Sequence, residues 1–68
     1  MNAKRSSFGE ALRRARLKKK LTQQALAERV GTTDGTYVSK WERNIVVPSL
    51  YYQQKLRKVL GNFFEEED

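Results

Sequence analysis

A single glycine between two amphipathic segments does most to limit the folds open to this chain. Gly31 follows Leu26, Ala27 and Val30, which recur at the spacing of one helix face. Glycine enters the left-handed conformation at a helix end without a steric penalty, so the first helix is predicted to end there. Thr22 is placed to cap its start, because a Thr hydroxyl accepts an unpaired backbone N–H of the first turn. The chain is therefore predicted to form a short helix between Thr22 and Gly31 and then to turn.

A second short helix is predicted directly after this turn. Thr33 or Asp34 can cap it. Its inward residues are expected to be Tyr37 or Val38, followed by Trp41 three or four positions later. Two helices joined by a glycine turn are the layout of a DNA-binding helix-turn-helix, whose second helix enters the major groove.

Length and cysteine content limit the class of protein. The 68 residues hold at most one domain, and the absence of Cys excludes a disulfide framework and a thiolate metal site. No apolar run is long enough for a transmembrane helix, and no apolar stretch follows the basic N-terminus as in a secretory signal. We therefore expect a cytoplasmic protein.

The charge is unevenly spread along the chain. The formal net charge is +6, but four of the eight acidic residues are the last four. Residues 1–61 therefore carry 14 basic against 4 acidic side chains, a net charge of +10. This balance favours a polyanionic partner, although a basic surface can also serve solubility alone.

Apolar spacing predicts two further helices on either side of the motif. Ser6 or Ser7 can cap the first, whose inward stripe is Phe8, Ala11, Leu12 and Ala15. The last begins at Pro48-Ser49 and ends at Gly61, with an inward stripe of Tyr52, Leu56, Val59 and Leu60.

The segments outside these helices allow more than one interpretation. Residues 1–5 are predicted to be a flexible basic arm, which either wraps the duplex or, as we prefer, is a frayed terminus. At least one of residues 45–47 is expected to fill the core, whereas exposure of more than one would make a partner surface. Residues 62–68 are predicted to be a short acidic tail or a truncated fifth helix, with one of Phe63 and Phe64 in the core and the other at an interface.

Several short motifs occur together and in order in this chain. They are Thr22-Gln23-Gln24, Leu26-Ala27-Glu28, Gly31, the run Tyr37-Val38-Ser39-Lys40-Trp41-Glu42-Arg43, and Pro48-Ser49. With these residues the chain resembles the lambda-repressor/Cro-like (XRE-type) helix-turn-helix family from about Phe8 to Gly61. The resemblance implies an all-α fold, a compact four- to five-helix bundle over residues 6–61 with the motif at about 22–43. It also implies sequence-specific binding to double-stranded DNA by a transcriptional regulator of the repressor type. A homodimer is expected, since family members bind two-fold DNA sites. A bacterial or phage origin and association with the nucleoid would fit the family.

One feature departs from the family pattern. Val38 and Trp41 lie one residue later than the two apolar positions that family members place late in the motif. We infer a one-residue insertion within residues 33–36, in the turn or at the tip of the second helix of the motif.

The resemblance also implies roles for individual residues outside the recognition helix. Arg16 is expected to pair with Glu42 and clamp the first helix to the third. The amide of Gln23 is expected to donate to a DNA phosphate, with a solvated capping residue as the alternative. Arg43 and Asn44 are expected to contact the phosphate backbone, and Asn44 stands where the family normally has a left-handed Gly, a conformation that Asn also accepts.

Base edges are expected to be read from the N-terminal part of the recognition helix, which runs from about residue 34 to 43. The candidates are Thr33, Asp34, Thr36, Tyr37 and Lys40. For Asp34 we rank helix capping ahead of base reading, and Lys40 can reach a phosphate or a guanine. Trp41 is assigned to the core rather than to base stacking.

No arrangement of residues indicates catalysis. The chain has no His, and its four Gly are scattered rather than grouped in a phosphate-binding loop. We therefore predict a non-enzymatic protein without cofactor, metal, membrane or small-molecule partner. The competing hypothesis is a protein-interaction module, either an antitoxin or the N-terminal adaptor domain of a larger protein.

Overall fold

Four helices make up the part of the chain that the structure describes. The computed structural model describes residues 7–64, so the predicted arm at 1–5 and the acidic residues 65–68 lie outside it. The helices are α1 (Phe8–Lys18), α2 (Gln23–Val30), α3 (Gly35–Glu42) and α4 (Leu50–Leu60), and no strand occurs in the described range. The predicted all-α fold is confirmed. None of these helices is long and apolar enough to cross a membrane.

Side-chain caps fix where three of the helices begin. The hydroxyl of Ser7 accepts from the N–H of Glu10 at 3.2 Å, and that of Thr22 accepts from the N–H of Ala25 at 2.9 Å. Asp34, rather than Thr33, caps α3, since its carboxylate accepts from the N–H of Thr36 at 2.8 Å. Such caps satisfy backbone donors that have no partner inside the helix.

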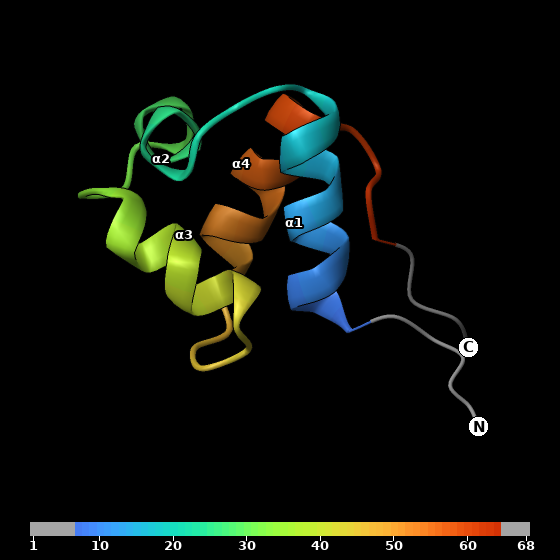
Figure 1. Cartoon of the computed structure of the whole chain (residues 1–68). Coiled ribbons are helices and arrows are strands. Elements are labelled where there is room, and N and C mark those ends of the chain that lie inside the picture. The colour runs from blue at the N-terminus through green and yellow to red at the C-terminus, as the bar shows by residue number, and fades with distance from the viewer. Residues whose placement is uncertain (1–6, 65–68) are drawn as a thin grey trace.

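Gly31 ends α2 as its sequence position predicts. Its φ of 81° is left-handed, and its N–H donates to the carbonyl of Ala27. This conformation turns the chain within four residues from the end of α2 to the start of α3. As Figure 1 shows, α3 then lies along one flank of the molecule.

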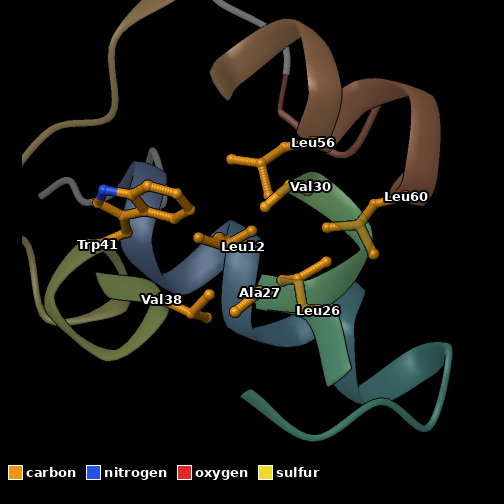
Figure 2. Packing of buried hydrophobic residues seen from close by; sticks show 8 residues of the cluster. All are labelled: Leu12, Leu26, Ala27, Val30, Val38, Trp41, Leu56 and Leu60. Carbon is orange, nitrogen blue, oxygen red and sulfur yellow. The ribbon is translucent and has the colours of Figure 1, made fainter. Parts of the chain in front are cut away.

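One apolar core joins all four helices. α2 contacts both α3 and α4, and α3 also contacts α1. Figure 2 shows the side chains that converge in the core, which are Leu12, Leu26, Ala27, Val30, Val38, Trp41, Leu56 and Leu60. Val38 and not Tyr37 therefore points inward from α3, and the assignment of Trp41 to the core is correct.

A close crossing of α1 and α3 depends on Gly9, which the sequence did not single out. Gly9 is buried, and a Cβ added there would lie 2.3 Å from the carbonyl oxygen of Glu42 and 2.8 Å from that of Trp41. No side chain fits in this space, so glycine is what lets the first turn of α1 touch the backbone at the end of α3.

The prediction that one of residues 45–47 fills the core is wrong. Ile45, Val46 and Val47 are all exposed, and Pro48 is the buried residue of this loop. The other outcome, in which more than one of the three is exposed, is the one observed.

Phe63 and Phe64 both fold back onto the start of α1. The ring of Phe8 meets that of Phe63 at 5.6 Å and that of Phe64 at 5.4 Å between centroids, each edge to face. Phe63 packs against the core as expected for one of the two. Phe64 is also partly buried, and its expected place at an interface stays a prediction.

Candidate nucleic-acid interface

Four of the five predicted base-contacting side chains are exposed or partly exposed at or beside α3. Thr33 is exposed just before the Asp34 cap, Thr36 and Tyr37 are exposed in the first turn of α3, and Lys40 is partly exposed one turn further on. Within α3, helical spacing places Thr36 and Lys40 opposite the buried Val38, with Tyr37 beside them. Thr36, Tyr37 and Lys40 therefore form a polar stripe along the solvent-facing side of α3, with Thr33 just before its N-terminus.

Asp34 has a structural role at the tip of α3. Its carboxylate accepts from the N–H of Thr36, the capping role that the sequence analysis ranked first. The negative charge at this helix end is favourable because it faces the positive pole of the helix dipole. A base contact from Asp34 stays a prediction.

Gly35 lets the tip of α3 approach the first turn of α2. A Cβ added to Gly35 would lie 3.1 Å from the backbone nitrogen of Gln24 and 3.3 Å from the Cβ of Gln23. The side-chain oxygen of Gln24 accepts from the N–H of Gly35 at 3.2 Å, which satisfies a further first-turn donor. Gly35 is therefore the first residue of α3, and it packs against the first turn of α2.

Arg16 and Glu42 form the predicted clamp between α1 and α3. Nε of Arg16 donates to Oε2 of Glu42 at 2.6 Å, and Nη2 donates to Oε1 at 3.2 Å. The side chains are 9% and 4% exposed, and Nη1 of Arg16 also donates to the carbonyl of Leu21 at 2.8 Å. This two-pronged geometry is the strong form of an Arg–carboxylate contact.

Gln23 extends this clamp to the N-terminus of α2. Its Nε2 donates to Oε1 of Glu42 at 3.1 Å, and the side chain is partly exposed. An amide nitrogen has two hydrogens, so one contact to Glu42 leaves a second donor whose direction is fixed by the first. The orientation of Gln23 is thereby set by a buried ion pair, which the sequence did not reveal. The phosphate contact of Gln23 stays a prediction.

Asn44 is tied to the start of α1. Its φ of 62° is left-handed, as its replacement of a family glycine led us to expect. Its Oδ1 accepts from the N–H of Gly9 at 3.1 Å, and its Nδ2 donates to the hydroxyl of Ser7 at 3.1 Å. These bonds use one of the two Nδ2 hydrogens, and the phosphate contact of Asn44 stays a prediction.

The backbone after α3 has few donors to offer a phosphate. The N–H groups of Arg43, Asn44 and Ile45 donate to the carbonyls of Ser39, Trp41 and Lys40. Arg43 has an exposed side chain beside this turn. Any phosphate contact here is therefore expected from the Arg43 side chain rather than from the backbone.

Replacing Asn44 separates its two structural contributions. Asn44→Ala should destabilise the protein by about 2 kcal/mol, since it removes two hydrogen bonds and leaves Cβ strain in a left-handed residue. Asn44→Gly loses the same bonds but relaxes the backbone, so it should be the milder change by about 1 kcal/mol. Urea unfolding of the two variants measures this difference, and equal stabilities would contradict it.

Within residues 7–64 no group of acidic residues is arranged to hold a metal ion. The interface described above consists of amide, hydroxyl and cationic side chains on α2, α3 and the turn that follows α3. These are groups that donate to phosphate oxygens and base edges.

Comparison with known protein families matches most of the chain. A family model described as helix-turn-helix matches residues 12–62, which includes α2, α3, α4 and most of α1. No curated protein and no solved structure matches the chain.

Proposed function

The chain belongs to the helix-turn-helix family of DNA-binding domains, and from this premise we propose that it is a sequence-specific regulator of transcription. In this proposal α3 enters the major groove of double-stranded DNA, and occupation of an operator represses transcription. The observation that carries it is the stripe of Thr36, Tyr37 and Lys40 on the solvent-facing side of α3, with the exposed Thr33 just before the helix. The protein would act where DNA is accessible, in the cytoplasm of a bacterial or phage-infected cell.

Affinity and specificity are assigned to different residues. Gln23, Lys40 and Arg43 lie along α2, α3 and the turn after it, and they would donate to phosphates. Thr36 and Tyr37 would meet base edges, a Thr through its methyl or hydroxyl group. The Asp34 carboxylate caps the first turn of α3, and the Gln24–Gly35 bond joins this turn to α2, so the stripe is presented on a fixed helix.

The first experiment is selection of bound sequences from a random duplex pool over a range of salt concentrations. Enrichment of a short motif is expected, and enrichment of a two-fold motif would indicate a dimer on the DNA. Salt-sensitive retention without any motif would reduce the proposal to non-specific DNA binding.

Removal of single cations tests the phosphate contacts. Lys40→Ala and Arg43→Ala should each weaken binding and make the slope of log affinity against log salt shallower by about 0.9. Lys58→Ala is the matched control, because Lys58 is an exposed cation of α4 outside the predicted interface. Fluorescence anisotropy with a labelled duplex measures both quantities. Unchanged slopes for both interface variants would contradict this binding mode.

The exposed loop at residues 45–47 supports a second candidate, a protein-interaction module. Under that hypothesis the chain would serve as an antitoxin or as an adaptor domain. Capture of a partner that withstands nuclease and high salt, combined with failure to bind any duplex at low salt, would favour it over DNA binding.

A further inference from the structure

A polar hollow lies where the first turn of α2 meets the first turn of α3. It has a volume of about 510 Å³, and its lining residues are Gln23, Gln24, Asp34, Gly35, Thr36 and Ser39. Apart from the glycine, all of these residues have polar side chains. The hollow therefore suits a ligand group that both donates and accepts hydrogen bonds.

The helix end inside the hollow has few donors left for a phosphate. The N–H groups of Gly35 and Thr36 already donate to the Gln24 side chain at 3.2 Å and to the Asp34 carboxylate at 2.8 Å. The Asp34 carboxylate also repels a phosphate group at short range. A base edge, which has no charge, is therefore the better occupant of the part of the hollow that Gln24 and Asp34 line.

Gly35 leaves the tip of the recognition helix without a side chain. Base edges are read from the N-terminal part of such a helix, yet the first residue of α3 can offer only its backbone N–H. The side chain of Gln24 binds this N–H and is itself exposed to solvent. Gln24 therefore presents an amide group at the start of α3, although it belongs to α2.

The hydrogen bonds of Gln24 fix the direction of its amide group. Its Oε1 accepts from the Gly35 N–H, a bond that the amide nitrogen could not accept, and its Nε2 donates to Oε2 of Glu28 at 3.4 Å. An amide oxygen can accept two hydrogen bonds, and an amide nitrogen can donate two. The contacts among the described residues thus leave Gln24 one acceptor and one donor position for a ligand.

We propose that Gln24 reads the edge of an adenine in the major groove and is a specificity-determining residue of the DNA-binding surface. Adenine presents its N6 amino donor beside its N7 acceptor in that groove, and a glutamine amide complements this pair. The bonds of Gln24 to Gly35 and Glu28 can be kept in such a contact. This inference rests on the proposed function, because it requires α3 to enter the major groove.

Selection from a random duplex pool with the wild type and three variants tests this role. The wild type should enrich a motif with an adenine at one position, and Gln24→Ala should lose the base preference there but keep the rest of the motif. Gln24→Glu should replace this adenine by cytosine, because a carboxylate accepts from the cytosine amino group but has no donor for N7 of adenine. Gln54→Glu is the matched control, since it makes the same change at an exposed glutamine of α4 and should keep the wild-type motif.

Anisotropy titrations with single duplexes measure the size of the effect. Replacing the adenine should weaken wild-type binding by about tenfold or more, the discrimination of a good two-bond contact, whereas Gln24→Ala should bind both duplexes within about twofold of each other. Both Gln24 variants are expected to fold, since the side chain is exposed and lies outside the core.

Gln24→Glu also separates base reading from mere support of α3, because its carboxylate can still accept from the Gly35 N–H. If Gln24 only held the tip of α3, Gln24→Glu would keep the wild-type motif and Gln24→Ala would weaken binding to every duplex alike. Either of these results would overturn the proposal while leaving the proposed function intact. A wild type that enriches no motif would instead overturn the proposed function, and this inference with it.

Discussion

Gly9→Ala is expected to destabilise this protein strongly. The added Cβ would lie 2.3 Å from the Glu42 carbonyl oxygen and 2.8 Å from the Glu42 carbonyl carbon, and these are backbone atoms that cannot rotate away. Separating α1 from α3 would in turn disturb the buried Arg16–Glu42 pair beside the crossing. We expect a loss of about 3 kcal/mol or more, at the upper end for overpacking. A domain of this size is stabilised by only about 3–10 kcal/mol in total, so a large unfolded fraction should appear at 37 °C.

Gly35→Ala is the matched control for this prediction. Both glycines lie in helices without a left-handed φ, and both changes add one methyl group. At Gly35 the new Cβ would lie 3.1 Å from the Gln24 nitrogen, a contact that a small shift relieves. The gain in helix propensity, about 1 kcal/mol, opposes that strain, so the stability should change by no more than about 1 kcal/mol. Thermal unfolding followed by circular dichroism compares the two, and similar midpoints would show that the α1–α3 crossing yields more easily than the structure indicates.

The helices were predictable because the signals for their ends are local. Thr22 and Gly31 act on backbone groups within their own turn, and the buried residues of α2 and α4 follow helical spacing in the sequence. The resemblance to a known family added the Arg16–Glu42 pair, which joins residues far apart in the chain and has no local signal.

What the sequence did not reveal depends on contacts between helices. Gly9 looks like any helix residue until α3 is packed on it, since only the distance to the Glu42 backbone shows why a side chain is excluded. The same holds for Asn44, whose bond to the Gly9 N–H crosses 35 positions of sequence. In the loop after α3, apolar character alone favoured burial of one of residues 45–47, but all three are exposed and Pro48 is the buried residue.

The sequence predicted where the candidate site lies better than it predicted the contacts that hold its side chains. The stripe on α3 follows from helix periodicity once Val38 is known to point inward. The partner of Gln23 could not be predicted, because the Glu42 carboxylate reaches the start of α2 only in the packed bundle. The one-residue insertion inferred within residues 33–36 stays a prediction, and the structure describes this stretch as an Asp34 cap followed by the first turn of α3.

Arg16→Met should have the second large effect. It would leave the Glu42 carboxylate, 4% exposed, with Gln23 as its remaining described side-chain partner, and it would also remove the donor to the Leu21 carbonyl. Removing one partner of a buried ion pair destabilises a protein by about 3–5 kcal/mol, because the other charge stays buried without compensation. Urea unfolding should therefore show a much lower midpoint for Arg16→Met than for wild type.

The double variant Arg16→Met with Glu42→Leu separates the pair's stabilising role from its orienting role. With both charges replaced by apolar groups, much of the stability lost in Arg16→Met should return, and a double-mutant cycle would give a coupling of about 2 kcal/mol or more. A double variant no more stable than Arg16→Met would contradict this account.

The double variant would still lack the Glu42 carboxylate that orients the Gln23 amide. If Gln23 contacts a phosphate, the folded double variant should bind DNA more weakly than wild type, and Gln23→Ala should weaken the wild type but change the double variant little.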